Sequence, residues 1–69
     1  MIRIDASDSS VKNAIKWLHA EYDCHTVGDT VNLFKSEFNG YLMLDNDWSW
    51  EVAIFSNDHE ATIFMLRFT

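Results

Sequence analysis

Proline is absent from the 69-residue sequence, and glycine occurs only at positions 28 and 40. Linkers and low-complexity segments are usually rich in these residues, so the sequence offers no point at which to divide the chain. We therefore predict a single domain covering residues 1–69. A domain of this size buries only about 60% of the surface that its unfolded chain exposes, which predicts marginal stability.

Cysteine and long apolar runs are also scarce. Because Cys24 is the only cysteine, an internal disulfide is excluded, whereas small secreted domains usually depend on several. Residues 1–5 carry two charges where a signal peptide would have an apolar core. No stretch approaches the roughly 18 apolar residues of a membrane span. We therefore expect a cytoplasmic protein that does not enter the membrane.

Basic residues are few, since five Lys and Arg stand against eleven Asp and Glu, which gives a net charge of −6. Nucleic acids and anionic membranes are bound largely through Lys and Arg, so we expect neither as a direct partner. The imbalance lies in the second half of the chain. Residues 1–35 carry five acidic and four basic side chains, whereas residues 36–69 carry six acidic side chains and a single basic one, Arg67.

Apolar residues nevertheless make up 48% of the sequence, enough for a folded core. Ile2 and Ile4 alternate with charged residues, which predicts a short strand over residues 1–5. Asp8 and its serine neighbours are candidate N-caps for a following helix. An amphipathic helix is predicted from apolar residues spaced by three and four, namely Val11, Ala14, Ile15, Leu18 and Tyr22.

Two glycine-containing pairs predict hairpin turns in the middle of the chain. Gly28-Asp29 fits a type II′ turn between strands at residues 24–27 and 30–34, and Asn39-Gly40 fits a type I′ turn. An alternative remains open for this segment. A helix over residues 30–38 is compatible with the helical spacing of three apolar side chains, Val31, Phe34 and Phe38.

The last third of the sequence predicts further strands. Residues 45–47 form a polar turn, and the strand over residues 48–55 has one apolar face, formed by Trp48, Trp50, Val52 and Ile54. Residues 56–59 predict another turn, and residues 61–68 are apolar on both faces, which is typical of a covered strand. The prediction is an α+β fold in which one amphipathic helix packs on an antiparallel β-meander of four to six strands.

Acidic and tryptophan side chains alternate in this region. Carboxylates steer a basic partner and tryptophan supplies contact area, two features that protein interfaces favour. The predicted protein-binding residues are Asp45, Asp47, Trp48, Trp50, Glu51, Asp58 and Glu60. In the alternative interpretation the acids only keep the domain soluble. Trp48 and Trp50 then belong to the core, because they share a strand face with other apolar residues.

The sequence gives little support for a catalytic or metal-binding site. The candidate ligands lack the C-x-x-C or H-x-x-x-H spacing that fixes a tetrahedral metal; they are His19, Cys24, His25 and His59. A nucleophilic Cys24–His59 pair would have to form across the fold. An EF-hand calcium loop starting at Asp45 would need Gly at Trp50 and Glu at Ser56. Since a chain of this length hardly encloses a substrate pocket, we predict no enzyme, metal or cofactor.

The sequence thus predicts a small acidic module that binds a larger protein with a basic surface. A sharper hypothesis is an inhibitor that masks a nucleic-acid-binding surface by presenting carboxylates where phosphates would lie. Phage and plasmid factors of this kind are often small and acidic, an analogy of size and charge only. The alternative is a structural or assembly subunit that forms a homodimer, because self-association would relieve the marginal burial.

Overall fold

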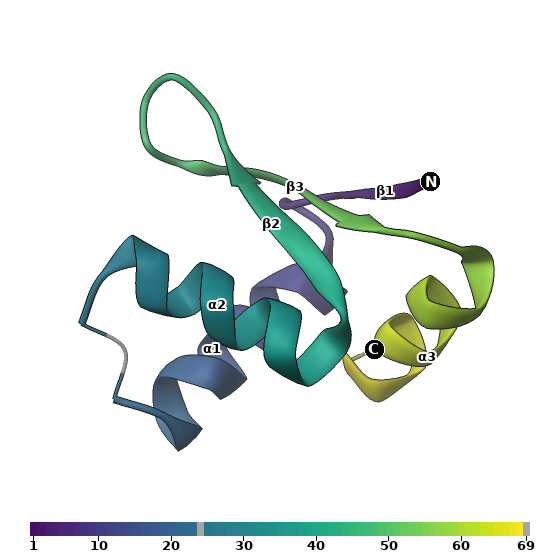
Figure 1. Ribbon diagram of the computed structural model, residues 1–69, viewed down its shortest axis with the longest axis horizontal. Helices are drawn as coiled ribbons and strands as arrows, with labels where there is room; N and C mark the ends of the chain where they lie inside the picture. Colours follow the sequence, from purple (N-terminus) through teal and green to yellow (C-terminus); the bar gives the residue numbers. More distant parts are fainter. Residues whose placement is uncertain (24, 69) are drawn as a thin grey trace.

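A computed structural model gives the fold and describes residues 1–23 and 25–68. The elements follow in the order β1 (Ile2–Asp5), α1 (Ser9–Glu21), α2 (Val27–Phe38), β2 (Gly40–Leu44), β3 (Trp50–Phe55) and α3 (Asp58–Phe68). The strands form one antiparallel sheet in the order β1–β3–β2, and the helices lie on one side of it (Figure 1). The α+β class is therefore confirmed. The described residues form three strands and three helices, so the predicted four to six strands and single helix are wrong.

β1 and α1 confirm the predictions for the start of the chain. Ile4 of β1 is buried, whereas Arg3 and Asp5 are exposed. α1 begins after Asp8, whose carboxylate accepts a hydrogen bond from the Ser10 N–H at 3.0 Å and so caps the helix. The predicted apolar face of this helix is buried at Val11, Ala14 and Leu18 and half-buried at Ile15, whereas Tyr22, also predicted for this face, lies just after α1 and is exposed.

The predicted hairpin at Gly28-Asp29 is wrong, because this segment belongs to α2. The Thr26 side chain accepts a hydrogen bond from the Asp29 N–H at 3.1 Å, and the Asp29 carboxylate accepts one from the His25 N–H at 3.2 Å. Such paired bonds stabilise the first turn of a helix. Cys24 lies outside the described residues. The alternative helix over residues 30–38 is right, and its buried side chains are Thr30, Phe34 and Phe38.

Asn39 ends α2 and does not form the predicted type I′ hairpin turn. Its backbone is left-handed, with φ 61° and ψ 31°, and its N–H donates to the Lys35 carbonyl at 2.9 Å. The predicted positive φ is therefore present, but it serves a helix C-cap. Gly40 begins β2 directly afterwards.

Residues 61–68, predicted as a covered strand, form most of α3. The Asn57 side chain accepts a hydrogen bond from the Glu60 N–H at 2.9 Å and caps the first turn. The helix leaves the apolar side chains of Ile63 and Leu66 exposed. These residues, added to the buried ones, make the segment look apolar on both faces when it is read as a strand. Its buried residues have helical spacing and are Ala61, Phe64 and Phe68.

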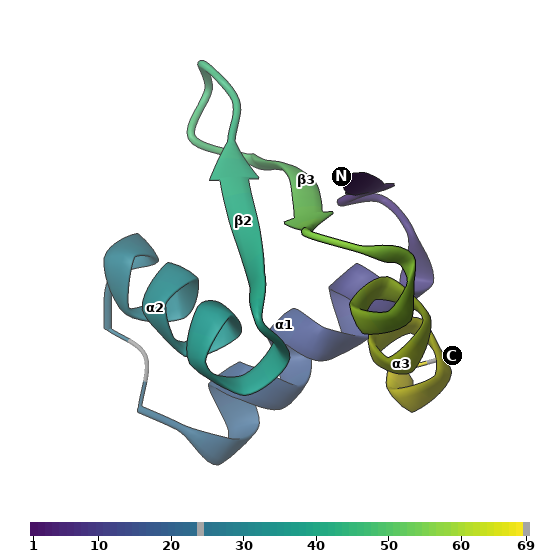
Figure 2. The ribbon, with the colours of Figure 1, turned by 45° about the vertical axis from the view of Figure 1, so that its right-hand side comes forward.

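Phenylalanine rings from three elements hold the helices against the sheet. Phe34 of α2, Phe55 of β3 and Phe64 of α3 are each at most 2% exposed. The ring centroids of Phe55 and Phe64 are 4.9 Å apart, and those of Phe34 and Phe64 are 5.4 Å apart. These contacts place the core between the sheet and the helices. The opposite face of the sheet is open, as the turned view also shows (Figure 2).

A β-bulge decides which side chains of β3 face the helices. Met43 stands opposite Val52, but Leu44 stands opposite Trp50, so Glu51 is the extra residue of the bulge. Trp50 therefore packs on the helix side with the core, while Val52 shares the open side with its exposed partner Met43 and is itself covered there, at 7% exposed. The prediction of one shared apolar face for residues 48–55 is wrong for this reason.

Candidate protein-binding site

The loop between β2 and β3, residues 45–49, is held by its own hydrogen bonds. The Asp45 N–H donates to the Ser49 carbonyl at 2.9 Å, and the Trp48 N–H donates to the Asp45 carbonyl at 3.2 Å. Oδ1 of Asp45 accepts two more bonds, from the N–H groups of Asp47 at 2.8 Å and Ser49 at 3.0 Å. These bonds fix the loop while it projects beyond the helices (Figure 2). We call residues 45–51 the acidic hairpin.

Trp48 is the most exposed aromatic side chain of the acidic hairpin. Its side chain is 77% exposed, and its backbone has a φ of 62°. The left-handed conformation costs a residue with a Cβ about 1–2 kcal/mol. Strain of this kind persists where the surrounding bonds impose it, and it concentrates at functional sites. Trp48 is thus a large apolar side chain held in solvent by an ordered loop.

The carboxylates of the acidic hairpin form no ion pair with Lys or Arg in the described part of the chain. Asp47 and Glu51 are exposed. Within residues 1–23 and 25–68, the structure shows one ion pair, between His25 and Asp23. No Lys or Arg in these residues therefore lies within ion-pair distance of the hairpin acids. Arg67 stacks on the ring of Trp17 instead, 4.6 Å from its centroid. The carboxylates of the acidic hairpin are therefore not ion-paired, and the basic residue near them is Arg3 of β1, which lines a shallow pocket with Glu51.

Trp50 belongs to the core side of the hairpin. It is half-buried and packs against the hydrophobic core. It also lines a shallow pocket with His19 and Thr30, whose Nε2 and Oγ1 atoms are 3.3 Å apart. The alternative interpretation of tryptophan as core thus fits Trp50, whereas Trp48 reaches the surface.

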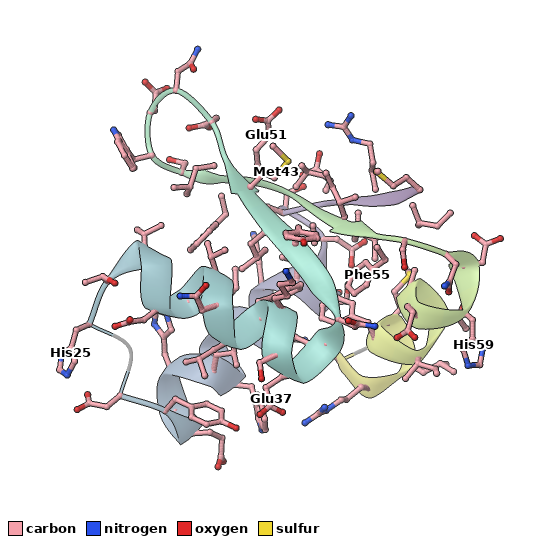
Figure 3. The ribbon with its side chains drawn as sticks, viewed as in Figure 1. His25, Glu37, Met43, Glu51, Phe55 and His59 are labelled. Carbon is pink, nitrogen blue, oxygen red and sulfur yellow. The ribbon has the colours of Figure 1, made fainter. Side chains whose placement is uncertain are left out.

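Asp58 and Glu60 do not join the acidic hairpin. They lie in the first turn of α3, at the opposite end of β3 from the loop. With a rise of about 3.3 Å per residue, β3 separates the two groups by roughly 20 Å. Figure 3 shows this separation through Glu51 and His59, which lie at the two ends. Asp58 and Glu60 instead complement the positive end of the α3 dipole. The structure therefore gathers Asp45, Asp47, Trp48 and Glu51 into one candidate site.

The remaining polar groups do not converge. Among residues 1–23 and 25–68, no group of three or more His, Cys, Asp or Glu side chains could hold a metal ion. The predicted candidate Cys24 lies outside this range. Tyr22, which follows α1, donates a hydrogen bond to Glu37 of α2, and this bond raises the pKa of the Tyr22 phenol above its ordinary value of 10.0. It ties the two helices together.

None of the helices in the described part of the chain is long and apolar enough to cross a membrane. Comparisons of the chain with protein-family models, curated proteins and solved structures found no match.

Proposed function

We propose that the protein is a binding module that docks its acidic hairpin against a basic surface of a larger protein. The observation that carries this proposal is Trp48, 77% exposed at φ 62° on a hydrogen-bonded loop. Tryptophan is the residue most often found among the dominant contacts of protein interfaces. Because the loop is already ordered, docking it costs little conformational entropy.

The charges around Trp48 suggest the chemistry of the partner. Asp47 and Glu51 lie on the same hairpin as Trp48, and both are exposed and not ion-paired with Lys or Arg among the described residues. Unpaired carboxylates accelerate association with a basic surface and disfavour acidic ones. Lys or Arg side chains of the partner would stack on Trp48 or pair with the acids.

A nucleic-acid-binding surface is the sharper form of the proposed partner. Such surfaces present rows of Lys and Arg that neutralise phosphates. The acidic hairpin would occupy that row, with carboxylates in place of phosphates and the indole of Trp48 in place of a base. The protein would then act as an inhibitor of nucleic-acid binding.

Affinity capture with matched variants tests this proposal. The wild-type protein is immobilised, host extract is passed over it, and retained proteins are eluted with a salt gradient. The first variant is Trp48→Ala, and the second is Asp47→Asn/Glu51→Gln. The matched control is Asp58→Asn/Glu60→Gln, which removes the same charge at the far end of β3.

We expect one retained protein that elutes at moderate salt and is displaced by duplex DNA. Both hairpin variants should bind it at least about tenfold more weakly, whereas the control should bind it normally. Equal loss in the control and the hairpin variants would show a general charge effect and contradict the proposal. If duplex DNA does not displace the retained protein, the proposal that the chain inhibits nucleic-acid binding is contradicted.

A further inference from the structure

β2 is the edge of the sheet that is suited to pair with another strand. The sheet order places both β1 and β2 at edges. β1 carries Arg3 and Asp5, and its end is turned away by a hydrogen bond from the Asp8 N–H to the Asp5 carbonyl at 3.0 Å. Charges and turns of this kind protect an edge from pairing, whereas residues 40–44 of β2 carry no charge.

The hairpin shows which backbone groups of β2 point outwards. The Asp45 N–H donates to the Ser49 carbonyl at 2.9 Å, so residue 45 bonds towards β3. In an antiparallel sheet the bonding direction alternates along the strand. Met43 therefore also bonds towards β3, while Leu42 and Leu44 turn their N–H and C=O groups to the free edge.

The ladder between β1 and β3 agrees with this assignment. The Ala6 N–H donates to the Glu51 carbonyl at 3.0 Å, so the odd-numbered residues of β3 bond towards β1. The even-numbered residues of β3, Val52 and Ile54, therefore direct their backbone groups towards β2, where they stand opposite Met43 and Tyr41.

We propose that two copies of the chain pair antiparallel along β2, about a two-fold axis at Leu42. Leu42 of each copy then exchanges two backbone hydrogen bonds with Leu42 of the other, and Gly40 stands opposite Leu44. The two three-stranded sheets become one continuous sheet. This register satisfies the outward backbone groups of both strands.

The same register brings apolar side chains together on the open face. Tyr41 is 52% exposed and Met43 is 48% exposed. Figure 3 shows Met43 on the side of the sheet away from the helices. Pairing about Leu42 places Tyr41 of each copy opposite Met43 of the other, a favourable contact between sulfur and an aromatic ring.

Charge complementarity identifies a second copy as the occupant of this edge. The Nζ atom of Lys35 lies 4.7 Å from the centroid of the Tyr41 ring, near the start of β2. Antiparallel pairing brings the other end of β2 from the second copy to this position, and Asp45 follows that end directly. Each Lys35 then meets an Asp45 of the other copy, twice by symmetry.

The paired segment is short, because β2 spans only Gly40–Leu44. Stable interfaces usually bury about 1,200–2,000 Å², more than a strand pair of this length provides. We therefore expect a dimer that dissociates in the micromolar range, so its fraction changes strongly with concentration. Analytical ultracentrifugation from low micromolar to millimolar protein measures this directly.

Charge pairs at the two facing positions test the register. In Tyr41→Glu/Met43→Glu, each Glu at 41 faces a Glu at 43 of the other copy, and association should weaken at least about tenfold. In Tyr41→Glu/Met43→Lys, opposite charges face each other and the dimer should persist. Mixing Tyr41→Glu/Met43→Glu with Tyr41→Lys/Met43→Lys should restore a mixed dimer. Circular dichroism confirms that each variant, altered at exposed positions, is folded.

Two outcomes overturn the proposal. One is a wild-type chain that remains a monomer at millimolar concentration. This outcome would count against the proposal even if β2 were found to pair with a strand of a different protein. The other is equal association of Tyr41→Glu/Met43→Glu and Tyr41→Glu/Met43→Lys. The test is independent of the acidic hairpin's partner, since Trp48→Ala alters a residue beyond the paired strand and should leave the dimer unchanged.

Discussion

Gly40 and Phe55 are cross-strand partners, and the Phe55 ring lies where a side chain of residue 40 would be. A Cβ added at Gly40 would lie 2.6 Å from Cε1 of Phe55. The ring cannot move aside, because Phe55 is fully buried and its centroid is 4.9 Å from that of Phe64 and 6.0 Å from that of Phe34. Close approach of backbone and ring therefore requires glycine at position 40.

Gly40→Ala should lower the free energy of unfolding by about 2 kcal/mol, because it forces an extra methyl group into a packed core. Gly28→Ala is the matched control. Gly28 lies in the first turn of α2, and its added Cβ would meet only Thr26 Oγ1, at an ordinary 3.6 Å. This variant should gain about 0.5 kcal/mol from helix propensity. Urea unfolding measures both, and equal effects would contradict the packing of Phe55 on Gly40.

Asn57→Ala tests the N-cap of α3. It removes the acceptor of the Glu60 N–H and should lower the free energy of unfolding by about 1 kcal/mol. Thr62→Ala, at an exposed position inside the helix, should leave stability unchanged or raise it slightly. If residues 61–68 formed a strand, Thr62→Ala would be the more destabilising of the two substitutions. Thr62 would then favour the strand, and Asn57 would not cap a helix. Thermal unfolding of the two variants distinguishes these cases.

The sequence signals for α2 and α3 lie at the starts of these helices. Short apolar runs are compatible with either a strand or a buried helix, and the pairs Gly28-Asp29 and Asn39-Gly40 are also typical of hairpin turns. The pattern Thr26-x-x-Asp29 spans the start of α2, and Asn57-x-x-Glu60 spans the start of α3. Each places an acceptor side chain where the first helical N–H groups need one. These patterns, read together with the apolar spacing, favour helices in both segments.

The candidate site was predicted only in part, for two physical reasons. The turn at Asp45 was predicted from its polar residues, and the structure confirms it. The bulge at Glu51 was not predicted, because alternation of apolar residues contains no sign of an extra residue. It puts Trp50 on the helix side and Val52 on the open side, whereas Trp48 lies in the loop before β3, in solvent. Charge alone predicts that Asp58 belongs with the hairpin acids, but formation of α3 places it at the other end of β3.

The stability of the protein should fall in acid through Asp8. Hydrogen bonds from the Ser10 hydroxyl at 2.6 Å and the Ser10 N–H at 3.0 Å lower the pKa of Asp8 below its ordinary value of 3.8. The folded state therefore binds fewer protons than the unfolded state in this range. The contribution of Asp8 is fully present above pH 3.8 and is lost as the pH falls through the lowered pKa.

Asp8→Asn keeps a good N-cap but does not titrate. The difference in stability between wild type and Asp8→Asn should be constant near neutral pH and should shift against the wild type below pH 3.8. Urea midpoints of both proteins across this range measure it. A difference that does not change with pH would show that the Asp8 carboxylate is not bonded to Ser10 in solution.

The conformation of Trp48 predicts a trade-off between stability and binding. Its φ of 62° strains any residue that has a Cβ, and glycine relieves this strain. Trp48→Gly should therefore raise the free energy of unfolding by about 1 kcal/mol relative to Trp48→Ala. Neither variant loses core packing, because the ring is exposed. Trp50→Ala is the contrasting control and should destabilise the protein, since Trp50 packs on the core.

Binding should respond to these substitutions differently from stability. Trp48→Gly and Trp48→Ala both remove the indole, so both should weaken capture of the basic partner by a similar factor although their unfolding free energies differ. Trp50→Ala should bind the partner normally at temperatures where it is folded, because the ring faces the helices. If Trp48→Gly is no more stable than Trp48→Ala, the loop carries no strain at this position. If Trp48→Ala binds as tightly as the wild type, the exposed indole is not the contact.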